Sequence, residues 1–354
     1  MSDVLPRVLL LRGDGVPLEP IDWIWPGYLP AGMLTLLGGA PGCGKTAIAL
    51  SLAATLTTGR PWPDGSPGQE AGDVILWSGE DPHSLSAAGL VACGADMQRV
   101  HFVERLEGGD AELFDPGRDM ALLAATAEAL KSPRLLILDP VVSAVAGDGH
   151  KNNQVRRSLQ PVVDLGRRLG CAVIGITHFA KSTSRRDPVE RITGSVAFSA
   201  LPRLVLVAAK GHIDGQPRRV LVRAKSNIGP DEDGFVYELE RVEIAAGITG
   251  QRVAWIEPIE GSAHAILSRV EDGKLEITST QSEIDSFVQR YLAEGPVAAR
   301  QFRIDAETAD FGWRRVYGRA SRTIARRTHR GAERAVALGQ CQGGLPARRC
   351  LALR

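Results

Sequence analysis

The sequence predicts an α/β fold with a mostly parallel sheet that helices cover on both faces. Short runs rich in Val, Ile and Leu alternate with helical stretches along residues 34–178. Such continuous apolar runs are typical of parallel strands that are buried on both faces. Further apolar runs at 203–207, 219–223, 235–239 and 253–256 follow one another without helices between them. We therefore expect them to extend the sheet with antiparallel strands.

A glycine-rich loop follows the first of these strands. Residues 39–46 read Gly-Ala-Pro-Gly-Cys-Gly-Lys-Thr, between an apolar run at 34–37 and a helical run that starts at Ala47. This is the G-x-x-x-x-G-K-T pattern, in which backbone N–H groups and a helix N-terminus surround phosphates. A chance glycine-rich turn is the alternative. We expect the loop to bind ATP through nine residues: Gly39, Ala40, Pro41, Gly42, Cys43, Gly44, Lys45, Thr46 and Ala47.

Two loop side chains and one strand-end carboxylate are expected to handle the phosphates and their metal ion. Lys45 would reach the β- and γ-phosphates, and the Thr46 hydroxyl would bind Mg²⁺. Asp139 ends the apolar run 135–138, where a carboxylate can position the same ion. The alternative for Asp139 is a turn residue before Pro140.

Two more strand ends carry side chains suited to catalysis. Glu80 lies in Ser-Gly-Glu-Asp and could orient and deprotonate a water molecule. Asp81 is the competing candidate, and a solvated acidic turn is the plain alternative. His178 ends the run 171–178, and either His178 or Thr177 could sense the γ-phosphate and relay its loss to the following loop. A structural role is the alternative for a histidine at a strand end. Because parallel strands bind ligands at their carboxyl ends, we expect all these groups at one edge of the sheet.

Composition limits the class of protein. No apolar run in the 354 residues approaches a membrane span of roughly 20 residues, and the first residues lack a signal-peptide pattern. We expect a cytoplasmic protein without membrane attachment. The five cysteines are scattered without C-x-x-C spacing, so neither a zinc site nor a disulfide framework is expected.

Charge is unevenly spread along the chain. Residues 299–354 hold 13 Arg, no Lys and 4 acidic residues, a net charge of +9, whereas the remainder carries −8. Three short helices with glycine turns are expected from residue 283, at 298–310 and at 313–325, and together they resemble a helix-turn-helix. An exposed arginine face would then meet DNA phosphates, although an ordinary solvated face is an equal alternative. The arginines concerned are Arg314, Arg315, Arg319, Arg322, Arg326 and Arg327.

We predict five segments. They are an N-terminal approach segment (1–32), an ATPase core (33–259), a linker (260–281), a helical, DNA-binding module (282–327) and a disordered tail (328–354). Trp23, Trp25 and Tyr28 in the first segment would either stack on a base or, as aromatic side chains more often do, pack against the sheet.

The order of these motifs resembles the RecA-fold ATPases. It is closest to the RepA-type replicative helicases of plasmids and phages, and DnaB helicases are more distantly similar. The motifs are Gly-Ala-Pro-Gly-Cys-Gly-Lys-Thr, Ser-Gly-Glu-Asp-Pro, Leu-Leu-Ile-Leu-Asp-Pro and Gly-Ile-Thr-His-Phe. The lead-in at 21–32 and the turn at 61–65 are also similar to that family. In all, the resemblance covers about residues 16–240.

This resemblance implies a homo-hexameric ring whose ATP sites lie between subunits. A neighbour would complete each site with basic residues. Arg203 is the candidate arginine finger, and a surface charge at a strand end is the alternative. Lys225 matches the lysine of the Lys-x-Arg-Asn-Gly hairpin of DnaB. In the present sequence, Asn227 stands where that hairpin has its arginine.

Two loops resemble the channel loops of such rings. They span 147–153 and 181–193, and the second carries four basic residues suited to a single-stranded DNA backbone: Lys181, Arg185, Arg186 and Arg191. The expected function is an ATP-driven motor on single-stranded DNA in the replication of a plasmid, phage or mobile element. The alternative is an ATP-switched DNA-binding regulator or recombination accessory that does not unwind DNA.

Overall fold

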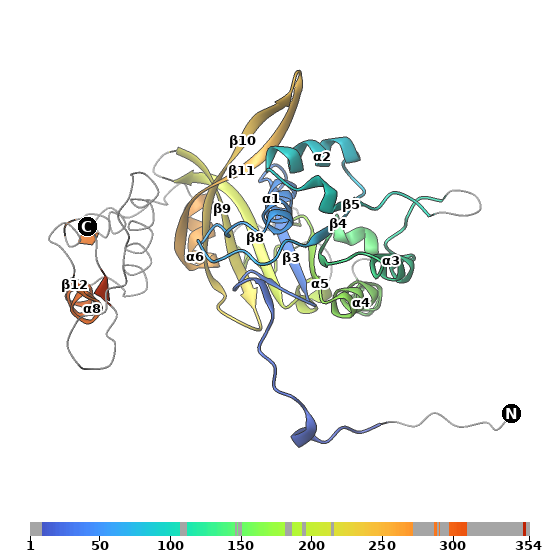
Figure 1. Ribbon diagram of the computed structural model, residues 1–354, viewed down its shortest axis with the longest axis horizontal. Helices are drawn as coiled ribbons and strands as arrows, with labels where there is room; N and C mark the ends of the chain where they lie inside the picture. Colours follow the sequence, from blue (N-terminus) through green and yellow to red (C-terminus); the bar gives the residue numbers. More distant parts are fainter. Residues whose placement is uncertain are drawn as a thin grey trace. The chain divides into compact units, whose positions relative to one another are not determined.

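The computed structural model divides the chain into two compact units, Met1–Leu275 and Glu276–Arg354 (Figure 1). The first unit contains the large sheet and all residues of the predicted nucleotide site. The structure describes residues 9–106, 112–145, 147, 151–180, 186–192, 196–213, 216–271, 287–288, 290, 297–309 and 350–351.

The first unit is built on a nine-stranded sheet with the order β11-β10-β9-β8-β3-β7-β6-β4-β5. From β5 to β8 all neighbours are parallel, and β8, β9, β10 and β11 pair antiparallel. The parallel strands are β3 (Leu34–Gly39), β4 (Asp73–Ser78), β5 (Val100–Phe102), β6 (Pro133–Asp139), β7 (Ala172–Ile176) and β8 (Leu204–Ile213). The antiparallel extension consists of β9 (Gln216–Ser226), β10 (Glu232–Ala245) and β11 (Ile248–Ser262). The predicted α/β class and the antiparallel extension are confirmed.

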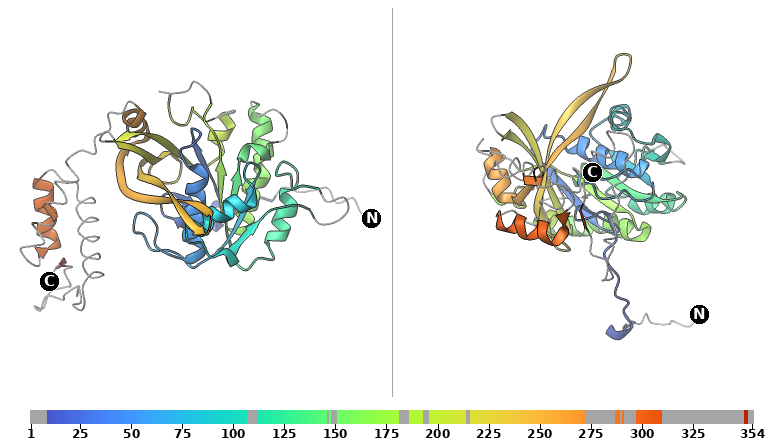
Figure 2. Two further views of the ribbon diagram at one scale, coloured as in Figure 1. Left: turned by 90° about the horizontal axis from the view of Figure 1, so that it is seen from above. Right: turned by 60° about the vertical axis from the view of Figure 1, so that its left-hand side comes forward.

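Helices pack on both sides of this sheet (Figures 1 and 2). On one side lie α1 (Lys45–Thr58) and α2 (His83–Ala92), which also contact β11. On the other lie α4 (Asn152–Leu169) and α6 (Ala263–Glu271), with α3 (Met120–Ala127) and α5 (Val196–Ala200) against α4. Short 3-10 helices are η1 (Gly13–Gly15), η2 (Met97–Arg99) and η3 (Val141–Ala144).

Two helices show how sequence pattern and burial correspond. The α4 helix buries one stripe, Val155, Leu159 and Val162, because these positions recur every three to four residues. The α1 helix is buried nearly all round, since the β10–β11 hairpin covers the side that faces away from the sheet. Within the described ranges, no helix is both long and apolar enough to cross a bilayer.

The predicted linker at 260–281 is wrong over its first part. Residues 260–262 complete β11, and α6 follows directly. Ile266, Leu267 and Val270 of α6 are buried, and the Val270 backbone approaches Gly211 of β8 so closely that a Cβ there would clash. The polar residues between Ile266, Leu267 and Val270 kept the sequence pattern from predicting this helix. The stability of α6 comes from its packing on the sheet.

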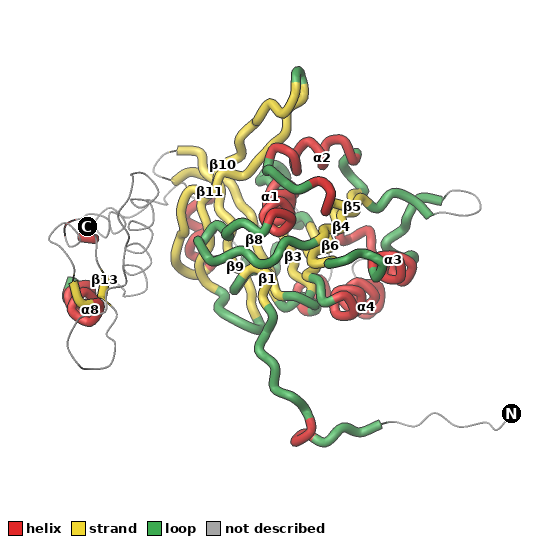
Figure 3. The backbone as a smooth tube through the Cα atoms, in the orientation of Figure 1, coloured by secondary structure: helices red, strands yellow, loops and turns green. Residues whose placement is uncertain are grey.

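The aromatic residues of the N-terminal segment belong to the core. Two short strands, β1 (Trp23–Trp25) and β2 (Leu29–Pro30), form a small antiparallel sheet. Trp25 is fully buried and stacks on Tyr28 and on Trp62, with ring centroids 4.1 and 5.4 Å apart. For Trp25 and Tyr28 the packing interpretation is therefore confirmed. Residues 9–22, which include η1, run away from the sheet (Figure 3).

The described part of the second unit is small. It contains α8 (Ala299–Thr308) and β12 (Val297–Ala298), which pairs with β13 (Cys350–Leu351). Phe287 and Phe302 stack with their ring centroids 5.9 Å apart. Residues 299–308 are helical, within the helix expected at 298–310, and residues 350–351 form a strand within the tail that was expected to be disordered. The six arginines of the expected DNA-binding face lie outside the described residues.

Candidate nucleotide site

The glycine-rich loop joins β3 to α1, and neighbouring strands press against it. A Cβ at Gly39 would lie 2.3 Å from the carbonyl oxygen of Ala208 in β8. Gly44, which caps α1, has a left-handed φ of 94°, and a Cβ there would lie 2.8 Å from Leu239 of β10. Larger residues at these two positions would displace the loop, so the glycines are required by close packing as well as by backbone conformation.

Lys45 is folded over the loop. Its side chain is buried, and Nζ donates to the carbonyl oxygens of Gly39 and Ala40 at 3.1 and 3.2 Å. The same nitrogen lies 3.3 Å from Nδ1 of His178. A buried ammonium group is thus held at the mouth of the loop, where it can exchange these carbonyl contacts for stronger contacts with phosphate oxygens.

Thr46 and Asp139 form the expected oxygen pair. The Thr46 hydroxyl donates to Oδ2 of Asp139 at 2.7 Å, although β6 and α1 are far apart in sequence. Burial raises the pKa of the Asp139 carboxyl, and the Thr46 hydrogen bond opposes this effect. The nearby charges of Glu80 and Asp81 raise this pKa further. A buried carboxylate beside a hydroxyl fits Mg²⁺, because the cation would compensate the buried negative charge.

Glu80 and His178 complete a chain of contacts across three strand ends. Oε1 of Glu80, after β4, lies 3.5 Å from Nε2 of His178, after β7. His178 in turn contacts Lys45. The Glu80 and His178 side chains are 53% and 38% exposed, so water reaches them. The backbone N–H of Asp81, the competing candidate, donates to the Ser78 hydroxyl.

The structure therefore brings five predicted residues to one edge of the sheet: Lys45, Thr46, Glu80, Asp139 and His178. Their convergence follows from strand order, since β4, β6, β7 and β3 are consecutive parallel neighbours. Sequence spacing alone could not give this order, but the rule that ligands bind at the carboxyl ends predicted the shared edge.

Arg203 and Lys225 lie at the opposite edge. The backbone N–H of Arg203 donates to the carbonyl oxygen of Leu34, the first residue of β3. Arg203 therefore lies about 17 Å from Gly39 along that strand. Nζ of Lys225 donates to the carbonyl oxygens of Ser199 and Pro202. Burial, and then the nearby Arg203 charge, lower the pKa of Lys225. Neither side chain reaches the glycine-rich loop of its own chain.

Tyr237 is a residue of the site that the sequence patterns do not predict. This residue of β10 is fully buried, and its hydroxyl donates to the Cys43 carbonyl oxygen of the loop at 2.6 Å. Burial raises the pKa of both the Tyr237 hydroxyl and the Cys43 thiol. The strand pattern predicts only that Tyr237 is buried, because its contact with the loop depends on strand pairing across the extension.

Arg191 is not available for DNA, which corrects its assignment to a channel loop. Its side chain is 8% exposed, donates to Glu271 of α6 at 2.5 Å and lies over the Phe179 ring at 4.4 Å. Arg186 is exposed. Lys181 and Arg185 lie outside the described residues.

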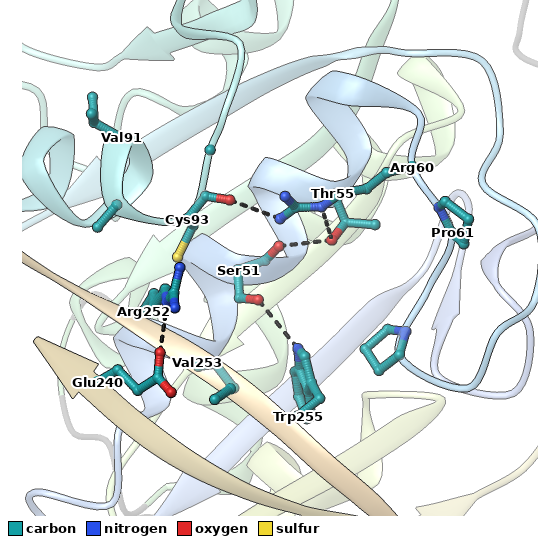
Figure 4. Close-up of a pocket in the computed structure, with 14 residues that line it drawn as sticks. Ser51, Thr55, Arg60, Pro61, Val91, Cys93, Glu240, Arg252, Val253 and Trp255 are labelled. Atoms are coloured by element: carbon teal, nitrogen blue, oxygen red, sulfur yellow. Dashed lines mark hydrogen bonds and ion pairs between the residues drawn. The ribbon is translucent and has the colours of Figure 1, made fainter. Parts of the chain in front are cut away.

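A separate cavity of about 500 Å³ lies between α1, α2 and the β10–β11 hairpin (Figure 4). Several polar groups in its wall are bonded to one another. Arg60 donates to Thr55 and Cys93, Trp255 donates to Ser51, and Arg252 pairs with Glu240. Of these contacts, the Trp255–Ser51 hydrogen bond joins the hairpin to α1, and none of the nucleotide-site residues lines the cavity.

The parallel sheet, the glycine-rich loop with its buried lysine, and the Thr46–Asp139 pair define a P-loop ATPase. A family model described as an AAA domain matches residues 3–184, just over half of the chain. The chain belongs to this family of AAA-domain ATPases. A comparison with curated proteins gives no match. The family match includes the loop, Glu80, Asp139 and His178, and it ends before Arg203 and Lys225.

Replacement of Asp139 by Asn should stabilise the nucleotide-free protein at neutral pH. The raised pKa means that the folded state binds a proton more tightly than the unfolded state. The stabilising contribution of the protonated Asp139 carboxyl is therefore present at acidic pH. It is lost as pH rises through the pKa of this carboxyl in the folded state. We expect Asp139→Asn to raise the melting temperature by a few degrees at pH 7.5 and by less at pH 4.5, measured by thermal unfolding.

Asp164→Asn, at an exposed position of α4, is the control for this prediction. Equal shifts at both pH values would rule out the buried-charge explanation.

Proposed function

We propose that this ATPase is a ring-forming motor of the RepA/DnaB helicase type. It uses ATP hydrolysis to move along single-stranded DNA during replication of a plasmid, phage or mobile element. The observation that carries the proposal is the distribution of charge over two edges of one sheet. The complete P-loop site lies at one edge, and the cations Arg203 and Lys225 lie together at the other.

Within one chain, the residues divide the work of hydrolysis. Glu80, half exposed beyond the loop, orients a water molecule and accepts its proton. Lys45 neutralises phosphate charge. Thr46 and Asp139 are the residues that would hold Mg²⁺, which supplies charge neutralisation between the β- and γ-phosphates when bound. His178 contacts both Glu80 and Lys45, so a change at either group reaches the segment that follows β7.

Between chains, the two edges of the sheet are complementary, because one carries the phosphate-binding loop and the other carries the cations Arg203 and Lys225. A head-to-tail contact would place the edge that carries Arg203 and Lys225 against the loop of the next copy. Such heterologous contacts close into rings when the rotation between copies allows it. A basic side chain supplied by a neighbour is worth on the order of 10³-fold or more in rate in related phosphoryl transfers. A hexamer is the ring that the resemblance implies.

Lys45→Ala should abolish ATP hydrolysis, because the buried ammonium group is the main cation at the loop. Glu80→Gln should keep nucleotide binding and lose most of the turnover, by about 10²-fold or more, since only the proton acceptor is removed. Steady-state phosphate release with and without single-stranded DNA measures both effects. Glu70→Gln, at an exposed loop position, should behave as the wild type. Unchanged turnover in Lys45→Ala would refute the site assignment.

Mixed oligomers test the proposed contribution of a neighbour. Arg203→Ala subunits keep a complete loop, and Lys45→Ala subunits keep Arg203. Each variant alone should be inactive, and an equal mixture should recover part of the ATPase activity, about one quarter if subunits assort at random and each interface acts alone. Sedimentation with ATP establishes that oligomers are present. Mixed oligomers without recovered activity would exclude Arg203 as the residue that acts across the interface.

An ATP-switched regulator is the second candidate, favoured by the net charge of +9 on residues 299–354. Such a protein would bind duplex DNA through phosphate contacts and hydrolyse ATP without separating strands. A forked duplex distinguishes the two functions. The motor should displace the labelled strand in an ATP-dependent reaction that Lys45→Ala abolishes. DNA binding and ATP hydrolysis without any displacement would favour the regulator.

A further inference from the structure

Three polar side chains form a row across the antiparallel extension. Lys210 of β8 is paired directly with Arg219 of β9, and Arg219 is paired directly with Tyr237 of β10. Directly paired residues of antiparallel strands point to the same face of a sheet. Ala208 and Leu221, two residues away from Lys210 and Arg219 on their strands, belong to the hydrophobic cluster that packs against α1. The row therefore lies on the α1 face, the face of the glycine-rich loop.

Both ends of this row meet the loop. The Tyr237 hydroxyl bonds to the Cys43 carbonyl oxygen. Nζ of Lys210 lies 3.7 Å from the position that a Cβ on Gly42 would take. Arg219, between them, is close enough for its charge to act on both the Cys43 thiol and the Tyr237 hydroxyl.

The two cations of the row have no counter-charge within the described part of the chain. Among the residues that the structure describes, no carboxylate lies within ion-pair distance of Lys210 or Arg219, and Nε of Arg219 is buried without a hydrogen-bond partner. The adjacent Arg218, in contrast, pairs with Glu238. Like charges directly opposite each other in a sheet destabilise it. An anion beside Gly42 would remove this cost.

We propose that Lys210, supported by Arg219, binds the nucleotide polyphosphate from within the same chain. Strand order places this contact on the far side of the loop from Asp139, because β8 flanks β3 on one side and β7, β6 and β4 lie on the other. The phosphates then lie between the residues that would hold the metal ion and a second lysine. Lys210 acts in ground-state binding of both ATP and ADP, whereas Lys45 and Glu80 act in turnover.

The inference rests on the proposed ATP binding, and the following measurements separate the two. Lys210→Ala should weaken binding of a fluorescent ADP analogue, and of ATP in competition with it, by about tenfold. The value of kcat at saturating ATP should stay within about twofold. The melting temperature without nucleotide should be unchanged or higher, because a like-charge contact is removed. Lys210→Arg should restore binding.

Lys131→Ala is the matched control. Lys131 is exposed just before β6, at the edge of the sheet opposite to the loop, and its removal should leave the Kd unchanged. A Kd for Lys210→Ala within twofold of the wild-type value would overturn the inference and leave the ATPase proposal intact. A lower melting temperature that Lys210→Arg does not restore would also overturn it, since the role would then be structural. Wild-type protein that binds no nucleotide would overturn both proposals.

Discussion

Two buried opposite charges at the end of one sheet are the constraint on which the site depends. Lys45 and Asp139 are 6% and 4% exposed, and each is held by uncharged partners, the loop carbonyls and the Thr46 hydroxyl. Buried charges are costly unless they are bonded or compensated. A phosphate anion and a divalent cation would compensate both, so the protein without ligands already has the charge pattern of the complex.

The antiparallel extension supports this arrangement from the outside. Tyr237 fixes the loop through Cys43, Leu239 packs against Gly44, and Trp255 bonds to Ser51 of α1. The strands that follow the parallel sheet therefore form the outer wall of the nucleotide site. This explains why α1 is buried on nearly every side, unlike the amphipathic α4.

Side-chain packing also links the segment after β7 to α6, near the end of the first unit. The Phe179 N–H donates to the Gly39 carbonyl oxygen, and Arg191 joins the Phe179 ring to Glu271 of α6. Arg191, which the sequence suggested as a DNA contact, instead stabilises the segment that directly follows His178. The residue type was compatible with either role, and burial decided between them.

The sequence by itself determined the strand–loop–helix unit, the parallel α/β class and five residues of the site, because each depends on local spacing or on the rule that parallel strands end at one edge. Only the tertiary structure decided that α6 replaces part of a linker, that Arg203 and Lys225 are remote from their own loop, and that Lys210, Arg219 and Tyr237 face it. These outcomes depend on strand register and on packing between segments distant in sequence, which local patterns do not encode.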